Sequence, residues 1–580
     1  MDIIFVLTMA KCPHRLVSGR QCDLSYGIGR FPRLLLAGMS VLVVAPANAA
    51  AQSSHTAWAE TFSGSPTEEY LRLLQVAGMV EMQPWGLRPF GPQQLARLTP
   101  ASDDHPWAQR IDFTQPRSTR PVFALVRPAT EIRLNSAFPA GSNDGPTWAG
   151  RGLTVTLAGG FATRAGPLSL VLAPTWFHAQ NSSFTLQPNG QSGDLVYADA
   201  RFPTGIDRPQ AFGDGSYSRL DPGESTLRLD ALGIAAGISS ASQWWGPAAF
   251  HPVLLGTNAG GFPHAFFGTA RPVSLRVIRL HGRLNWGRLD QSRFSPVTGS
   301  EYFRSIDEPG TRRFMAGLVL TAEPTFLPGL ELGLSRFFHE GWPEGGLTGR
   351  HFRLPIETLF KQNIVDTLVA TGQNQLLSVF ARWVVPSARL EVYAERGKDD
   401  HSWDARDLIL ETEHSASTTF GMAKVWPGPG RLTALRAEVI NYQSPANAAL
   451  RLEPGFYPHS VLRQGHTHRG QLLGTNVGAG SGSGAIVSVE RYTRRGKLGI
   501  SLARDQVDRP LRAPATMPES EVKTTLQLEA IRFAPLADIT ARVGLTDARR
   551  WNFSSHTTNL SFMLGARAAL PGRSRARPGT

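Results

Sequence analysis

The sequence predicts an all-β fold, a transmembrane antiparallel β-barrel over about residues 126–570. From about residue 130 onward, short segments alternate apolar and polar side chains, and clusters of Gly, Pro, Asn, Asp and Ser separate them. The segments run roughly 9 to 12 residues, the length that a tilted strand needs to cross the hydrocarbon layer. Past the leader, no apolar run approaches the roughly 18 residues that mark a transmembrane helix. Such a chain can span a membrane only as a closed barrel.

The N-terminus predicts a signal peptide over residues 1–49, and therefore export. Arg30 and Arg33 precede the apolar run Leu34–Ala45, and Ala47-Asn48-Ala49 supplies an A-x-A cleavage site. The competing interpretation is a buried core segment, but the apolar run is too short to span a membrane as a helix.

This leader has two unusual features. Its recognisable signal begins only at about residue 30, so residues 1–29 are either a mis-assigned translation start or a long n-region. It also contains both cysteines of the chain, Cys12 and Cys22, so the mature chain would contain no disulfide. Its five basic and two acidic residues account for part of the net charge of +13, and their removal leaves +10.

Residues 50–125 predict a small helical module followed by a polar connector at about 99–121. EEYLRLLQVAGMVEM (Glu68–Met82) repeats apolar residues at helical spacing, with Gly78 weakening the last turn. GPQQLARL (Gly91–Leu98) predicts a second short helix. The module precedes the strand-rich region in the sequence.

The strand-rich region alternates with a period of two, which places successive side chains on opposite faces of a sheet. In KLGISLAR, Leu498, Ile500 and Leu502 share one face, opposite Ser501. A soluble β-sandwich alternates in the same way, but arginines recur on the polar face here, which suits a wet lumen. The other clear cases are Ile278, Leu280, Leu284 and Trp286 opposite Arg279, His281, Arg283 and Asn285; Leu390, Val392 and Ala394 opposite Arg389, Glu391, Tyr393 and Glu395; Leu435, Ala437 and Val439 opposite Arg436 and Glu438; and Leu560, Phe562 and Leu564 opposite Asn559 and Ser561.

Strand signals continue for about 440 residues, which at roughly 20 to 25 residues per strand and connection predicts about 16 to 20 strands. The long connections Ser182–Glu224 and Tyr302–Arg312 are expected to form extracellular loops or to fold into the lumen. PGPG (427–430) and RRG (494–496) are expected to form tight periplasmic turns. Residues 571–580 form a basic C-terminal tail, where many outer-membrane proteins end on an aromatic residue.

Several blocks of sequence resemble the Wzi-type capsule assembly outer-membrane proteins. QWWGPAAFHPVLLGTNAGGFPHAFFGT (243–269) is similar to the family's Gln-Trp-Trp-Gly-Pro start, Asn-Ala-Gly-Gly-Phe-Pro centre and Gly-Thr end. YPHSVLRQGHTHRGQLLGTNVGAGSGS (457–483) is similar to its late Gly-x-Thr-His-Arg-Gly-Gln-x-Leu-Gly segment. The order of the blocks over nearly the whole mature chain makes the resemblance specific. The others are WGLRPF (85–90), LNSAFPAGSNDGPTWAGRGLT (134–154), GPLSLVLAP (166–174), LEVYAERGKDDHSWDARDL (390–408) and EHSAS (413–417).

This resemblance implies a barrel of about 18 strands, with a helical module near its periplasmic side and a largely blocked lumen. It implies a lectin-like role, in which the protein holds capsular or exopolysaccharide at the cell surface and takes part in capsule assembly. Neither catalysis nor a cofactor comes with the family.

Residues 243–269 contain no charged side chain and several Gly and Pro residues. A segment of this kind cannot face lipid, because its backbone groups would lack partners, so we expect it to plug the lumen or cover the barrel mouth. Its aromatic faces also match the apolar faces of sugar rings, whereas packing alone is the competing explanation. The candidate residues for glycan binding or plugging are Gln243, Trp244, Trp245, Asn258, Phe262, His264, Arg279, Arg283, Tyr393, His466, His468 and Arg469.

The polar residues of the predicted lumen allow two interpretations each. The arginines Arg279, Arg283, Arg389 and Arg436 either pair with Glu391, Glu395 and Glu438 across strands, or attract an anionic polysaccharide. GHTHRG, with its His-x-His pair, suggests zinc, but no Cys and no third ligand lie near it in sequence, so we expect a hydrogen-bonding loop and no metal. Asp399, Asp400, Asp404 and Asp407 lack the spacing of known calcium loops.

Catalysis has little support in the sequence, since neither G-x-S-x-G nor H-E-x-x-H occurs. A glycosidase pair such as Glu391/Glu395 is equally what an alternating barrel strand would show. The leading interpretation is a polysaccharide-binding barrel of the outer membrane; the alternatives are a porin for sugars or anions and, more weakly, a glycan hydrolase. The expected partners are capsular or exopolysaccharide, lipopolysaccharide with the membrane lipid, and the barrel-insertion machinery, with no nucleic acid and a monomeric state.

Overall fold

The computed structural model describes residues 57–569, except 117, 298–311, 344, 358–372, 400–411, 446–454, 511–512 and 514–515. The expected signal peptide, the C-terminal tail, the predicted loop from Tyr302 up to residue 311 and the three aspartates Asp400, Asp404 and Asp407 lie outside the described residues.

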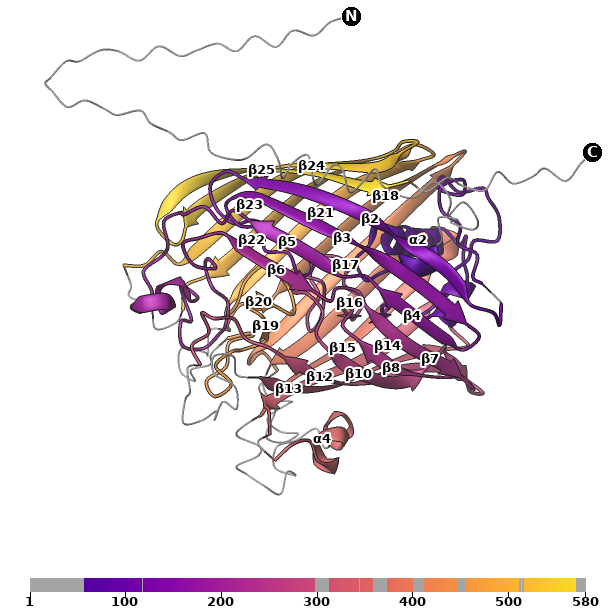
Figure 1. Cartoon of the computed structure of the whole chain (residues 1–580), viewed down its shortest axis with the longest axis horizontal. Helices are drawn as coiled ribbons and strands as arrows, with labels where there is room; N and C mark the ends of the chain where they lie inside the picture. Colours follow the sequence, from indigo (N-terminus) through magenta and orange to yellow (C-terminus); the bar gives the residue numbers. More distant parts are fainter. Residues whose placement is uncertain are drawn as a thin grey trace, which may run out of the picture. The chain divides into compact units, whose positions relative to one another are not determined.

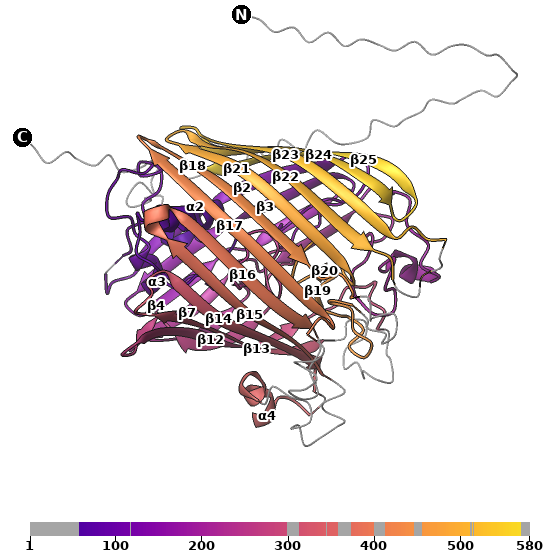
Figure 2. The same cartoon turned by 180° about the vertical axis from the view of Figure 1, so that it is seen from behind.

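The described chain forms a closed antiparallel barrel, whose strands run obliquely to the barrel axis (Figures 1 and 2). Eighteen strand positions close the wall in the described part, which confirms the predicted fold class. Three positions are each made of two short strands. β3 pairs with both β4 and β5, which in turn pair with β7 and β6, and β12 pairs with both β10 and β11. The wall strands are β2 (Val122–Asn135), β3 (Gly152–Ala165), β4 (Leu168–Leu172), β5 (Thr175–Ala179), β6 (Tyr217–Asp221), β7 (Thr226–Ala231), β8 (Ile234–Ser239), β10 (His264–Thr269), β11 (Val273–Ser274), β12 (Ile278–Leu289), β13 (Arg313–Pro324), β14 (Leu330–Gly341), β15 (Gln373–Val385), β16 (Leu390–Asp399), β17 (Ala416–Gly428), β18 (Arg431–Asn441), β21 (Gly482–Thr493), β22 (Gly496–Asp508), β23 (Ser520–Phe533), β24 (Ala537–Trp551) and β25 (Ser555–Ala568).

The barrel closes where its first wall strand meets its last one. In the register of β2 with β25, Ala129 lies opposite Arg567 and Asn135 opposite Ser561. The ring of strand positions is therefore complete in the described part of the chain, and the sheet does not end in a first and a last edge strand.

The connections differ in length between the two ends of the barrel. At one end β17 turns into β18 within PGPG and β21 turns into β22 within RRG, so both are tight turns as predicted. At the other end, most connections are long, among them the segments between β8 and β10 and between β18 and β21. The expected loop Ser182–Glu224 is shorter than predicted, because Tyr217–Asp221 forms β6 and pairs with β5.

The side chains of the wall are apolar outside and polar inside. On β22, Leu498, Ile500 and Leu502 are 64%, 46% and 54% exposed, whereas Lys497 on the same strand is 4% exposed and points inward. Such an inverted distribution excludes a soluble sandwich and fits a wall surrounded by lipid. No helix of the described chain is long and apolar enough to span a membrane.

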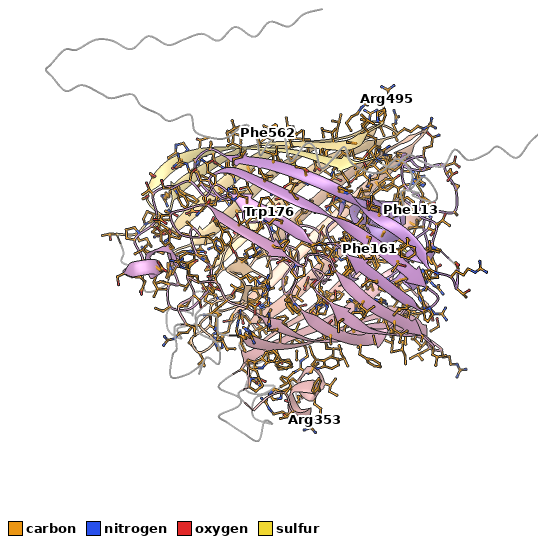
Figure 3. All side chains as sticks on the ribbon, in the orientation of Figure 1. Phe113, Phe161, Trp176, Arg353, Arg495 and Phe562 are labelled. Atoms are coloured by element: carbon orange, nitrogen blue, oxygen red, sulfur yellow. The ribbon has the colours of Figure 1, made fainter. Side chains whose placement is uncertain are left out.

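Exposed aromatic side chains lie on the outer surface of the barrel, and such side chains are enriched at membrane–water interfaces. Phe161, Trp176 and Phe562 are labelled in Figure 3, and their exposed fractions place them on the outside. Trp383 and Trp426 lie near the strand ends at the short-turn end, where they mark one boundary of the apolar band.

The N-terminal module consists of η1 (Ala57–Ala59), α2 (Pro66–Val76), β1 (Leu87–Arg88) and α3 (Pro92–Arg97). α2 begins after Ser65, whose side chain accepts the N–H of Glu68, and Pro66 suits its first turn. The prediction of a helix to Met82 was wrong, because Gly78, with φ +74°, takes the left-handed conformation that ends helices.

The module packs against the inner wall of the barrel near the short turns, and both views place α2 within the barrel outline (Figures 1 and 2). Tyr70 and Leu74 of α2 join Trp107 in a core cluster, together with strand residues close to those turns, among them Val425 and Tyr492. The remaining elements are η2 (Gly193–Tyr197), β9 (Trp244–Trp245), α4 (Gly349–Arg353), η3 (Leu354–Ile356), η5 (Pro386–Ala388), β19 (Thr467–His468) and β20 (Gln471–Leu472).

Candidate functional site

The segment between β8 and β10, residues 240–263, forms a plug inside the barrel. Trp245, Leu254 and Leu255 are at most 1% exposed and share a core cluster with Tyr457 and Leu473 of the connection between β18 and β21. Two long connections therefore pack on one another in the lumen, in an apolar core that also includes wall residues such as Met315 and Phe337. The predicted lumen-plugging loop lies where it was expected.

Carboxylates of the wall hold this irregular backbone. Glu438 on β18 accepts the N–H groups of Ala249, Phe250 and His251, at 2.6, 3.1 and 2.5 Å. Asp399 on β16 accepts the N–H of Tyr457 at 2.6 Å. A buried loop carries many amides with no ladder partner, and each costs free energy if it stays unsatisfied. The charged faces of the wall thus supply the hydrogen bonds that the plug lacks.

The same device attaches the N-terminal module. Glu331 on β14 accepts the N–H groups of Trp85 and Gly86, at 2.8 and 2.7 Å. Glu391 on β16 forms an ion pair with Arg72 of α2 at 3.0 Å and another with Arg382 of β15. These groups are buried, so the module is held by paired charges and not by apolar contact alone.

The plug and the module are joined to each other by β1 and β9. These strands pair antiparallel, with Leu87 opposite Trp245 and Arg88 opposite Trp244. The guanidinium of Arg88 lies 4.8 Å from the ring centroid of Trp244 and donates to the carbonyl of Gly246 at 3.0 Å. Burial lowers the pKa of Arg88 to about 10, and its ion pair with Glu68 opposes that shift. The sequence blocks WGLRPF and QWWG are thus one structural unit.

The predicted residues at the start of the plug form a hydrogen-bonded chain. The side-chain oxygen of Gln243 accepts the indole N–H of Trp245 at 3.0 Å, and its nitrogen lies 3.0 Å from Nε2 of His264. Nδ1 of His264 lies 2.8 Å from the carbonyl oxygen of Phe262. All four side chains are buried, which fits a plugging role.

The predicted strand residues have partners of their own. Arg279 forms an ion pair with Glu323 at 3.1 Å. Arg283 is buried, donates to the carbonyl of Pro89 at 3.3 Å and lies over the ring of Phe266. These pairings favour structural roles for the arginines, although the partners differ from the glutamates expected from sequence.

Two more predicted residues also have wall partners. The hydroxyl of Tyr393 donates to Glu438 at 2.6 Å. Arg436 pairs with Glu490 at 3.2 Å. Both side chains belong to the network around the plug and the module.

His466, His468 and Arg469 are likewise engaged in packing. Nε2 of His466 lies 2.6 Å from the carbonyl oxygen of Leu254, and Nδ1 of His468 accepts the N–H of Asp290 at 3.1 Å. Burial lowers the pKa of His466 to about 3, so its ring is neutral at ordinary pH. Arg469 forms ion pairs at 2.9 Å with Asp221 and at 3.1 Å with Asp290. The two imidazoles have separate partners, and the described residues contain no cluster of three or more metal ligands.

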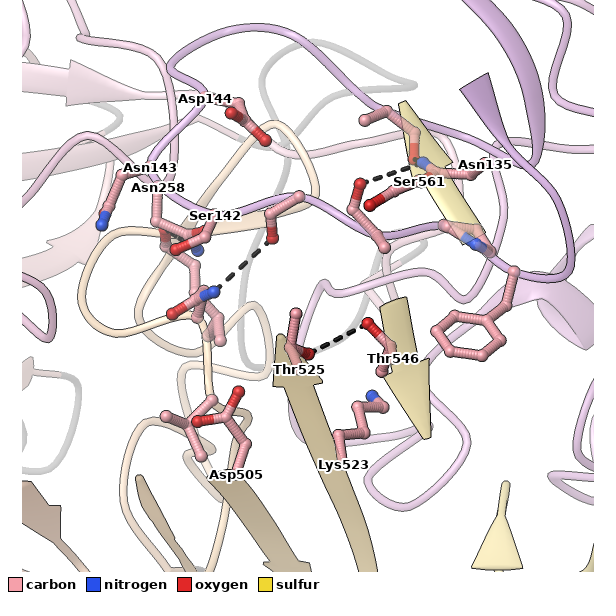
Figure 4. A pocket seen from close by; sticks show the side chains of 18 of the residues that line it. Asn135, Ser142, Asn143, Asp144, Asn258, Asp505, Lys523, Thr525, Thr546 and Ser561 are labelled. Atoms are coloured by element: carbon pink, nitrogen blue, oxygen red, sulfur yellow. Dashed lines mark hydrogen bonds between the residues drawn. The ribbon is translucent and has the colours of Figure 1, made fainter. Parts of the chain in front are cut away.

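A cavity of about 540 Å³ remains beside the plug, against β22 to β25 and β2 (Figure 4). Its wall carries small inward side chains, including Ser501, Ala503 and Ser561, beside large ones such as Gln527 and Arg542. The core clusters of the plug and the module include wall residues of β12 to β18, among them Phe337 and Val425. The open volume remains against the other part of the wall.

Aromatic rings line the end of this cavity at the long connections. Phe138 and Trp551 stack with centroids 4.0 Å apart, and Phe184 lies 6.5 Å from Trp551. The ammonium of Lys523 lies 4.8 Å from the Trp551 ring centroid. The plug borders the cavity with Trp244 and Asn258, the latter donating to the carbonyl of Leu472 at 3.1 Å. Flat rings beside amides and hydroxyls suit a ligand with both apolar faces and hydroxyl groups.

Of the residues predicted from sequence, Trp244 and Asn258 line this cavity. The others lie elsewhere in the plug, in the connection between β18 and β21, or in the wall. The sequence analysis did not name the wall residues of the cavity as site residues. The alternation nevertheless placed two of them, Ser501 and Ser561, on the inner face. Trp551 is the last residue of β24, at the tight turn to β25, and this turn has no motif of its own.

Comparisons with known proteins agree with this architecture. The sequence model of the family described as capsule assembly protein Wzi matches residues 154–560. Among curated proteins, no relative matches the chain. Wzi from Escherichia coli, described as an outer membrane protein involved in group 1 capsule assembly and as a carbohydrate-binding β-barrel, has a TM-score of 0.57 at 12% identity, over 88% of this chain and 99% of that one.

Solved porin structures are similar at a lower level. A BenF-like porin from Pseudomonas fluorescens has a TM-score of 0.34 at 8% identity, over 78% of this chain and 100% of that one. OccAB4 from Acinetobacter baumannii has a TM-score of 0.36 at 9% identity, over 78% and 98%. The structural likeness to E. coli Wzi shows the fold, and the family match covers more than half of the chain. The chain therefore belongs to the Wzi family of capsule assembly proteins, which places it among the β-barrels of the outer membrane.

Proposed function

We propose that this protein is a lectin-like barrel that binds capsular or exopolysaccharide at the cell surface and so takes part in capsule attachment. The cavity beside the plug is the proposed binding site. The observation that supports it most is the aromatic end of the cavity, where Phe138, Phe184 and Trp551 adjoin a wall of hydroxyl and amide side chains. The carbohydrate binding described for E. coli Wzi agrees with this role.

The blocked lumen argues against a porin. The plug and the module are hydrogen-bonded to the wall and to each other, so an aqueous path would require both to move. We also propose that the protein is not an enzyme. Glu391, one member of the imagined glycosidase pair, is 1% exposed and engaged by two arginines, and neither it nor Glu395 lines the large cavity.

The proposal extends to export and partners. The leader would direct the chain across the inner membrane, and N-terminal sequencing of the mature protein should begin at Ala50. The apolar outer surface would contact lipopolysaccharide and membrane lipid after assembly by the insertion machinery. We expect a monomer, because the barrel is closed by its own strands.

A deletion strain complemented with variants tests the function. Loss of the protein should move capsule from the cell-bound to the shed fraction without reducing the total. Trp551→Ala should reproduce much of that shift, because it removes an aromatic face from the cavity, and loss of a stacking aromatic costs about 1 kcal/mol or more. Trp426→Ala, which removes a ring from the lipid-facing surface, is the matched control. Unchanged capsule attachment in the deletion strain would refute the proposal.

A further inference from the structure

We infer that the cavity binds an uncharged, linear stretch of the polysaccharide, lying along β23. This inference rests on the proposed function and narrows its ligand. The cavity has three features that bear on the chemistry of the ligand: its charges, its polar groups and its shape.

The charges of the cavity balance. Its lining contains five basic and six acidic residues. Four of the cations have carboxylate partners: Arg133 with Asp144 at 2.5 Å, Arg208 with Asp199 at 3.1 Å, Lys523 with Glu521 at 2.9 Å and Arg542 with Glu529 at 3.6 Å. At these four cations, an acidic sugar would have to displace a carboxylate and bring a further negative charge beside it. A paired lining therefore disfavours a polyanion, despite the basic composition of the whole chain.

Two charged residues of the lining have no oppositely charged partner among the described residues, and their own charges are opposite. Arg201 donates to the carbonyl of Asp508 at 3.4 Å and lies beside the ring of Phe202. Asp505, on β22, has a side-chain oxygen without a hydrogen-bond partner among the described residues. A single acceptor and a single donor of this kind suit hydroxyl groups, which can both donate and accept.

The neutral polar groups lead to the same conclusion. The lining has amides and hydroxyls from several elements, and each can act in both directions; they include Asn135, Ser142, Asn143, Asn258, Gln471, Thr525, Gln527, Thr546 and Ser561. Recognition of a carboxylate would call for donors alone, as arginine forks provide. Alternating donors and acceptors beside aromatic rings match the hydroxyls and the C–H faces of neutral sugars.

The shape of the cavity indicates a chain and not a single ring. Five successive inward positions of β23, from Glu521 to Glu529, line it. Eight residue steps along a strand correspond to about 27 Å. A volume of about 540 Å³ is within the roughly 300–1,000 Å³ usual for ligand sites. Spread along a strand, it forms a narrow trough, which begins at Trp551 and ends near Glu529.

The test uses the full-length protein, purified as a folded barrel in detergent. The probe is capsular polysaccharide extracted from the cells that express this protein. It is used in two forms, the native polymer and the polymer whose carboxyl groups have been chemically reduced to alcohols. Calorimetric titration should give dissociation constants for the two forms that agree within about threefold. They should also change by less than about twofold between about 50 and 500 mM NaCl, since screening acts on charge.

Variants locate the site. Thr525→Trp fills the middle of the trough and should abolish binding, whereas Thr524→Trp, the neighbouring residue on the outer face, should bind as the wild type does. Heat-modifiable migration on SDS gels verifies folding, and Ser501→Phe, which narrows the trough from β22, serves if Thr525→Trp does not fold.

The outcomes separate the two claims. If neither form of the polysaccharide binds, the proposed function fails. If only the native acidic form binds, and salt weakens that binding more than about tenfold, an uncharged ligand is ruled out although the function stands. If both forms bind equally to Thr525→Trp, Ser501→Phe and the wild type, the trough is not the site.

Discussion

At the scale of single residues, Glu438 shows how a charge inside the barrel stabilises irregular structure. Its carboxylate accepts three backbone N–H groups of the plug and the hydroxyl of Tyr393. Charged acceptors strengthen such bonds, and their removal leaves buried donors without a full partner. The alternation of the sequence placed Glu438 inside, but it could not reveal that the partner is backbone and not arginine.

Glu438→Gln tests this role. We expect the loss of charge to destabilise the plug by about 3 kcal/mol. Planar-bilayer recordings should then show larger or more frequent openings than the wild type, and the folded band on SDS gels should disappear at a lower temperature. Glu413→Gln, at an exposed position before β17, should behave as the wild type. Identical recordings for all three proteins would contradict the assignment.

At the scale of the elements, glycines make room in the wall for the aromatic side chains of the plug. A Cβ at Gly317 on β13 would lie 2.4 Å from the ring of Trp245, closer than real contacts allow. Sequence alternation predicted the strands and their faces well, because a period of two is a local property. It could not predict which glycine meets which ring, because that contact joins residues more than 70 positions apart.

Gly317→Ala should therefore displace Trp245 and loosen the plug, at a cost of about 1–3 kcal/mol for overpacking. Protease accessibility of residues 240–263 in the folded barrel would measure it. Gly499→Ala is the matched control, since a Cβ at that inward position of β22 has its nearest neighbour at 3.7 Å. Equal cleavage of the two variants would show that the plug does not depend on this fit.

At the scale of the whole molecule, the fold was largely readable from the sequence and the candidate site was not. The outward apolar side chains, the tight turns and the plugging segment were all predicted, because lipid imposes a simple local pattern. The cavity depends on where the plug and the module pack inside the closed wall. That placement emerges only once the contacts between distant segments are known.

The occluded lumen leads to a prediction for the wild-type barrel. In planar bilayers it should pass little or no steady current, because the plug and the module occupy the interior beside the trough. A large, stable conductance from protein that migrates as a folded barrel would instead favour the porin alternative.

The pairing of β1 with β9 has a consequence for traffic across the membrane. One strand belongs to the module at the short-turn end, and the other to a connection that leaves from the opposite end. Neither strand can leave the lumen without breaking its hydrogen bonds to the other, so the module and the plug hold each other in place. Under the proposed function, a polymer as bulky as a capsule chain would therefore reach the exterior through another protein before it is retained here.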